Sequence, residues 1–133
     1  MDNSDPLRNV GFAKTDNNAA GRRLVDVVGG NGFRTGRPPA QDITVIGYPA
    51  LSPYPGNRRH SCRGRTSVFN DDRIVVNCRL TAGLNGGSGV TEFNSGRGTG
   101  YINGTSIGRD ATRWASPYFD EFGWDLYVYA DNL

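Results

Sequence analysis

The sequence predicts an all-β fold of one domain, with a single α-helix at its C-terminal end. The chain has 133 residues, which is the length of one domain. Its 19 glycines are roughly twice the ordinary share, so many residues are expected in turns and a helical bundle is disfavoured. Short β-branched runs alternate with segments rich in Gly, Pro and Asn, which is typical of a β-barrel or sandwich.

The first half of the chain contains one clear strand. A short apolar segment at 24–28 is ended by a glycine-rich turn, and Pro38-Pro39 follows. Residues 42–48 read D-I-T-V-I-G-Y, a β-branched run bounded by Gly and Pro49, and they predict a strand. The Pro- and Gly-rich segment after it is expected to be a long loop.

Two hairpins are expected in the second half. Residues 66–69 and 74–76 are β-prone runs separated by Asn70-Asp71-Asp72, a composition that favours a tight turn. Residues 90–94 and 98–102 are also β-prone and are joined by a short polar segment. The spacing of these strands indicates one domain over residues 1–133, with no boundary inside it.

The C-terminal segment changes to helical periodicity. Apolar residues fall on one helical face at Phe119, Phe122, Leu126, Ala130 and Leu133. Ser116 is expected to cap this helix and Pro117 to occupy its first position. The β-prone run at 127–129 favours a strand instead.

The charge balance excludes several classes of protein. Fifteen basic residues against 13 acidic ones give a net charge of +2, which argues against a nucleic-acid binder. No run reaches the length of a membrane span, and the first ten residues contain no apolar stretch typical of a signal peptide. Arg58, Arg59, Arg63 and Arg65 cluster around His60; a solvated loop is the favoured interpretation, and an anionic partner is the alternative.

The two cysteines, Cys62 and Cys78, do not have the spacing of a zinc site, and no metal or cofactor is expected. A disulfide between them would close a loop of about 15 residues and add about 3 kcal/mol of stability, in an oxidising compartment. Two buried thiols are the alternative. The spacing alone does not choose between them.

One segment has the composition of a catalytic turn. Residues 78–88 read C-R-L-T-A-G-L-N-G-G-S, in which glycines frame a single polar residue. Acyl-transfer enzymes place a nucleophile on such a turn, where backbone N–H groups converge on the oxyanion and glycines let the substrate approach. An ordinary glycine-rich loop has the same composition, and this segment taken alone favours the loop.

Three further motifs favour the catalytic turn over the ordinary loop. I-G-Y-P at 46–49, G-R-R-L-V-D-V-V-G-G-N-G at 21–32 and S-P-Y-F at 116–119 occur together with the glycine-framed turn. Over residues 9–130 the chain resembles the trypsin-like serine peptidases, in particular their secreted bacterial branch. The resemblance implies the C-terminal barrel of a chymotrypsin-like two-barrel fold, followed by a helix, with the N-terminal barrel largely absent.

The resemblance also shows where the catalytic triad departs from the family pattern. The family motif G-x-S-G-G corresponds to Gly83-Leu84-Asn85-Gly86-Gly87, so Asn85 stands at the nucleophile position. The triad Asp position corresponds to Asn9, in N-V-G-F, and the motif that carries the triad His is missing. His60 lacks the context of that motif. An amide cannot replace the serine nucleophile.

Other features of the family are retained. The resemblance implies an oxyanion hole formed by the N–H groups of Gly83 and Asn85, and a substrate-pairing strand at Ser106-Ile107-Gly108. It also implies a disulfide between Cys62 and Cys78.

These observations predict a degenerate serine endopeptidase homologue, inactive by the triad mechanism, that binds extended peptide segments. One alternative is an active endopeptidase completed by upstream residues, by a partner N-terminal barrel, or by a dyad of His60 with Ser88 or Ser106. Another is a fragment without function. Neither nucleic acid nor membrane is an expected partner. The family is secreted, but the compartment of this chain is left open.

Overall fold

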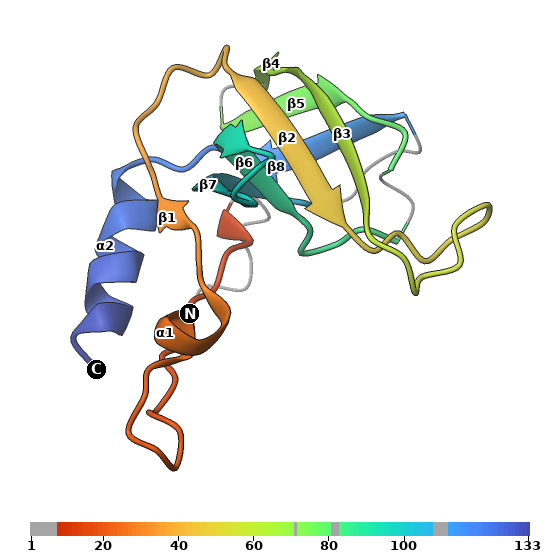
Figure 1. The fold of residues 1–133 in the computed structure, drawn as a ribbon. Coiled ribbons are helices and arrows are strands. Elements are labelled where there is room, and N and C mark those ends of the chain that lie inside the picture. The colour runs from red at the N-terminus through yellow and green to blue at the C-terminus, as the bar shows by residue number, and fades with distance from the viewer. Residues whose placement is uncertain (1–7, 71, 81–82, 108–111) are drawn as a thin grey trace.

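The computed structural model describes residues 8–70, 72–80, 83–107 and 112–133. Strands dominate, and a long helix lies at the C-terminal end (Figure 1). The elements are α1 (Leu24–Val28), β1 (Gly32–Phe33), β2 (Asp42–Gly47), β3 (His60–Arg65), β4 (Ser67–Phe69), β5 (Arg73–Asn77), β6 (Ser88–Asn94), β7 (Thr99–Thr105), β8 (Arg113–Pro117) and α2 (Glu121–Asp131). The predicted all-β fold with a C-terminal helix is therefore confirmed.

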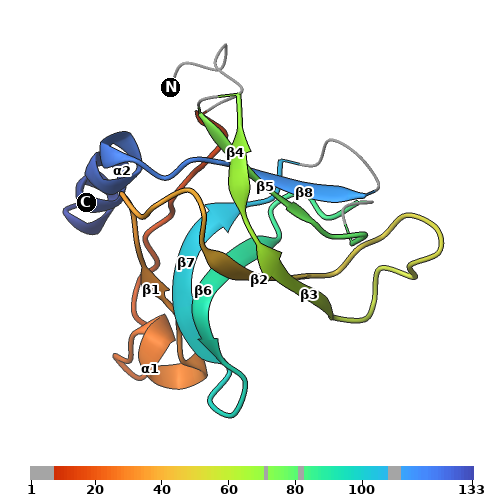
Figure 2. The same cartoon turned by 90° about the horizontal axis from the view of Figure 1, so that it is seen from above.

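The strands form two sheets. The larger sheet has the order β1-β7-β6-β2-β3 and the smaller one the order β4-β5-β8. All pairings are antiparallel except the short parallel contact of β1 with β7. The predicted hairpins are present as β4–β5 and β6–β7, and Figure 2 shows β6 and β7 curving side by side. The strand predicted at 42–48 is β2.

The core lies between the two sheets. Trp114 in β8 is fully buried, and two glycines flank its ring: a Cβ atom at Gly89 or at Gly104 would lie within 2.7 Å of a ring carbon. Aliphatic side chains from both sheets complete the core. They include Ile43, Val45, Ile74, Val76, Leu80 and Leu84.

A disulfide joins the two sheets. Cys62 in β3 and Cys78, just after β5, are bonded, with their Cα atoms 6.0 Å apart. Cys78 is buried and Cys62 packs against the core cluster. The disulfide interpretation is confirmed, and the alternative of two free thiols is excluded.

The structure corrects two expectations about local structure. β3 occupies His60–Arg65, where the arginine cluster was interpreted as a loop. The C-terminal helix begins later than expected, because Asp120 is its cap and accepts hydrogen bonds from the N–H groups of Phe122 and Gly123. Ser116 and Pro117 belong to β8, where the Ser116 hydroxyl accepts a bond from the Thr105 N–H and ties β8 to β7.

The side of α2 that packs against the rest of the molecule also differs from the predicted one. Ala130 is buried, but Phe122 is 38% exposed and Leu133 is 73% exposed. Tyr127 instead contacts the rings of Phe12 and Phe33, at centroid distances of 5.7 and 5.1 Å. In the described residues, no helix combines the length and apolar character that crossing a membrane requires.

Candidate functional site

The candidate site is built around the glycine-framed turn that follows β5, here called the Asn85 turn (Gly83–Gly87). Gly83 and Gly86 both have φ in the left-handed region, at 69° and 81°. Leu84 is buried and anchors the turn in the core, since Gly47 of β2 leaves space for its side chain. Asn85 is exposed at the apex. The glycines therefore let the turn expose Asn85 while the buried Leu84 side chain holds the turn against the core.

Backbone hydrogen bonds fix the turn against the end of β7. The Gly86 N–H donates to the Ser106 carbonyl at 2.9 Å, and the Ser106 N–H donates to the Gly87 carbonyl at 2.8 Å. The Gly87 N–H closes the turn on the Leu84 carbonyl at 2.9 Å. The apex is therefore held in one place before any ligand binds.

The two amides of the predicted oxyanion hole are unused within the described part of the chain. Neither the Gly83 N–H nor the Asn85 N–H donates to another described residue. A Cβ atom at Gly83 would lie 3.0 Å from the Ala50 backbone nitrogen, so only glycine fits there without displacing the β2–β3 loop. Unpaired amides on a rigid turn are what an oxyanion hole requires, although their assignment to this role stays a prediction.

A cleft of about 560 Å³ opens on one side of the Asn85 turn. Asn9 and Asn85 both line it, so the fold brings together the two residues that the sequence predicts at substituted triad positions; that assignment stays a prediction. Ser88 and Thr105 add further polar groups, Ser106 also lines the cleft, and none of the lining residues carries a formal charge. Phe12, Phe33 and Phe119 are the aromatic part of the lining, and we call this the aromatic cleft.

A smaller cleft of about 370 Å³ lies on the other side of the turn, against the end of β2. It is lined by Gly47, Tyr48 and the whole Asn85 turn. Asn85, Gly86 and Ser88 line both clefts. The two clefts are therefore adjacent and meet at the Asn85 turn, and we refer to them together as the trough.

The predicted substrate-pairing strand is adjacent to the trough. Ser106 lines the aromatic cleft, and its backbone N–H and carbonyl bond the Asn85 turn as described above. The Ile107 N–H donates to the Ala115 carbonyl at 3.0 Å. Gly108 lies outside the described residues. The role of this segment in binding peptide backbone stays a prediction.

The alternative dyad with His60 does not match the strand register. His60 lies opposite Gly47, whereas Ser88 lies opposite the neighbouring residue Ile46. Because successive residues of a strand point to opposite faces, the side chains of His60 and Ser88 lie on different faces of the sheet. The ring of His60 packs edge-on against Tyr54 at 5.0 Å. Ser106 follows β7, which β6 and β2 separate from β3.

The aromatic wall was not anticipated from the sequence. Phe12 and Phe33 make an edge contact at 5.1 Å, and Phe33 contacts Phe119 at 5.5 Å. These residues come from three separate segments; the sequence motifs include Phe12, in N-V-G-F, and Phe119, in S-P-Y-F and on the predicted helical face, but nothing in them places the three rings together. No cluster of three or more His, Cys, Asp or Glu side chains suited to a metal ion occurs in the described part of the chain.

Comparisons with known proteins agree with this architecture. The chain is similar in structure to the thermostable serine protease AL20 from an extremophilic microorganism, with a TM-score of 0.72 and 24% identity over 85% of this chain. It is also similar to the protease Anisep from Arthrobacter nicotinovorans, with a TM-score of 0.74 and 26% identity over 88% of this chain.

This chain spans about half the length of those two structures, 54% and 55%. No protein-family model matches the sequence, and a search of curated proteins finds no match either. The fold is nevertheless that of the trypsin-like serine proteases, as the sequence motifs predicted.

Proposed function

We propose that this chain binds extended peptide segments along the trough on both sides of Asn85 and does not hydrolyse them by a serine triad. The observation that carries the proposal is that Asn85, Gly86 and Ser88 line both clefts. Two adjacent clefts that meet at the apex suit an extended ligand, and their polar uncharged groups suit peptide amides. Asn85 offers an amide where triad hydrolysis needs a nucleophile.

Calorimetry with extended peptides tests the binding. The chain should bind peptides, and Asn85→Lys should weaken this binding by about tenfold or more, because a long side chain at the exposed apex obstructs the trough. Asn57→Lys makes the same change at an exposed residue of the β2–β3 loop and should leave affinity within about twofold. Absence of heat at every peptide concentration, or equal losses in the two variants, would contradict the proposal.

A second candidate function is an endopeptidase that a second protein unit completes. It is favoured by the fold shared with serine proteases of about twice this length. The exposed apolar side chains of α1, Leu24, Val25, Val27 and Val28, offer a surface that an additional barrel would cover.

A serine-directed covalent probe followed by mass spectrometry tests whether this chain holds an active serine nucleophile. The inactive chain should remain unlabelled, because no serine occupies the apex of the Asn85 turn. Stoichiometric labelling of one serine, Ser88 or Ser106 for example, would instead identify an active nucleophile and overturn the assignment of Asn85.

A further inference from the structure

A groove on the outer face of the larger sheet is separate from the trough. It measures about 410 Å³, and Arg37, Arg63, Arg65, Asp42 and Glu92 supply its charged side chains. We call it the arginine groove. It shares no lining residue with the aromatic cleft or with the smaller cleft. A ligand bound here would leave the Asn85 turn free.

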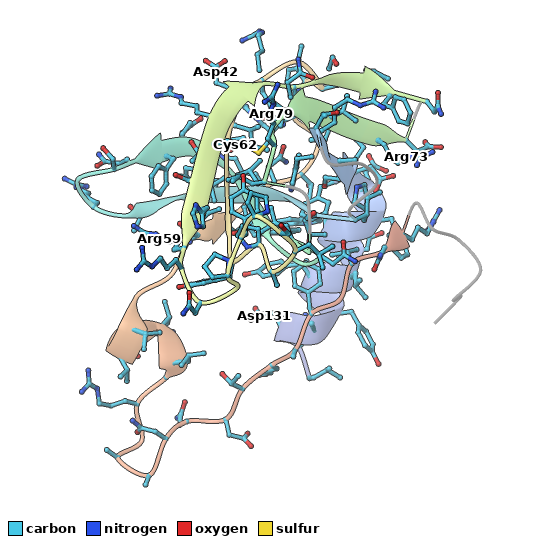
Figure 3. The ribbon with its side chains drawn as sticks, turned by 90° about the vertical axis from the view of Figure 1, so that its right-hand side faces the viewer. Asp42, Arg59, Cys62, Arg73, Arg79 and Asp131 are labelled. Carbon is cyan, nitrogen blue, oxygen red and sulfur yellow. A yellow bond between two sulfur atoms is a disulfide. The ribbon has the colours of Figure 1, made fainter. Side chains whose placement is uncertain are left out.

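The alternation of β3 directs its arginines into this groove. Arg63 and Arg65 are exposed, whereas the intervening Cys62 and Gly64 are partly buried toward the core. Figure 3 shows Asp42 and Arg59 toward opposite ends of the strand that carries Cys62. The arginine cluster of the sequence is therefore only partly a loop: Arg63 and Arg65 lie on one face of a strand, whereas Arg58 and Arg59 precede it.

The floor of the groove is a row of paired residues across three strands. Arg63 of β3 lies opposite Thr44 of β2, and Thr44 lies opposite Val90 of β6. Thr44 and Val90 are 8% and 1% exposed. Arg63 therefore stands beside a well-packed floor, where its methylene groups can pack while the guanidinium faces the groove.

Both carboxylates of the groove already have cationic partners. Asp42 is 3.4 Å from the Arg65 guanidinium, which also donates to the Ala40 carbonyl at 3.2 Å. Glu92 accepts a hydrogen bond from Arg34, which raises the pKa of that guanidinium, and lies 4.0 Å from Arg37.

The position of Glu92 is set by its backbone and by a stacked partner. Glu92 has a φ of 51°, in the left-handed region, where the pairing of β6 with β7 shifts register. Such a bulge redirects a side chain, at a conformational cost. Arg34 is in turn held 3.5 Å above the ring of Tyr101. The Glu92 carboxylate is thereby held on Arg34, and no ion pair joins it to Arg63 among the described residues.

Arg63 is left without an ion pair or side-chain hydrogen bond among the described residues, although it lines the same groove as two carboxylates. We propose that the arginine groove binds the carboxylate of an acidic side chain in an extended segment of a partner protein, with Arg63 as the bidentate donor. Guanidinium and carboxylate match in geometry and charge. Asp42 and Glu92 repel any anion in the groove, and they repel a singly charged carboxylate less than a phosphate dianion.

Fluorescence anisotropy at low ionic strength tests the proposal with a labelled peptide that carries one Glu among Gly and Ser residues. The chain should bind it, and a Gln version of the peptide should bind about tenfold more weakly. Arg63→Gln should cause a similar loss. Arg58→Gln removes the same charge from the loop before β3, outside the groove, and should change affinity by about twofold or less.

Three results would overturn the proposal. Equal losses in Arg63→Gln and Arg58→Gln would indicate non-specific attraction by net charge. Tighter binding of a phosphoserine peptide than of the Glu peptide would identify a different anion. No binding of the Glu peptide at low ionic strength would show that the groove does not bind carboxylates. Because both arginines are exposed, neither variant is expected to unfold, and Trp114 fluorescence checks this.

Discussion

Ser106 and Ser116 are both buried, at 3% and 0% exposure, but their hydroxyl groups differ in what they contact. The Ser116 hydroxyl accepts from the Thr105 N–H at 2.9 Å and donates to the Pro117 carbonyl at 2.8 Å. The Ser106 hydroxyl has no hydrogen-bond partner in the described part of the chain. A buried polar group without a partner costs free energy in the folded state.

Replacement of each serine by alanine should therefore have opposite consequences for stability. Ser106→Ala should leave the free energy of unfolding unchanged or raise it by up to about 1 kcal/mol, because it removes an unsatisfied hydroxyl. Ser116→Ala should lower it by about 1–3 kcal/mol, because it leaves the Thr105 N–H without an acceptor. Urea unfolding followed by tryptophan fluorescence measures both values. Equal destabilisation of the two variants would show that Ser106 has a partner.

The residues of the site were predictable from the sequence to different degrees. The Asn85 turn was visible because its glycines lie close together in the chain, and the resemblance to the family predicted Asn9 as a second substituted position. The structure places both residues on one cleft. The aromatic wall could not be foreseen, because Phe12 and Phe33 meet only through the tertiary fold. Local sequence predicts a turn, whereas a cleft depends on contacts between distant segments.

At the scale of elements, the packing of β6 and β7 over β8 depends on two glycines that leave space for Trp114. A Cβ atom at Gly104 would lie 2.7 Å from both the Trp114 ring and the Ser116 hydroxyl. Gly104→Ala should therefore lower the free energy of unfolding by about 1–3 kcal/mol through overpacking. Gly11→Ala is the matched control, because no heavy atom lies within 4 Å of its added Cβ and its φ is not in the left-handed region.

The same urea unfolding assay measures both glycine variants. If Gly104→Ala were as stable as Gly11→Ala, the sheets would have to separate slightly to accept the methyl group. A fully buried indole between two strands leaves little room for that adjustment. The comparison therefore shows whether the packing of β6 and β7 against β8, next to the Asn85 turn, can adjust to an added methyl group.

The sequence indicates the strands that are rich in apolar residues and does not indicate the strand that is mostly polar. β2 has a β-branched run with a buried centre, and this composition predicts the strand. β3 alternates charged or polar residues with Cys62 and Gly64, so its inward face has too few apolar side chains to reveal it. The cap of α2 was misplaced because Ser116 suits a cap by residue type, yet its hydroxyl is used to join β8 to β7.

At the scale of the whole molecule, the disulfide is the covalent link between the two sheets. Cys62 and Cys78 are 16 positions apart, and the bond restricts the unfolded chain over that loop. In the chain-entropy model a loop of about 15 residues contributes about 3 kcal/mol. This is a large fraction of the stability expected for a single domain, which is about 5–15 kcal/mol.

Reduction of the disulfide should therefore lower the free energy of unfolding by about 3 kcal/mol. Urea unfolding of the oxidised chain and of the chain kept reduced by a thiol gives the comparison, with tryptophan emission, to which the buried Trp114 contributes, as the signal. A sharp transition in the oxidised chain would show that these residues form one cooperative unit. An unchanged midpoint after reduction would mean that the packing of β3 against β5 holds the sheets together without the bond, contrary to the entropic account.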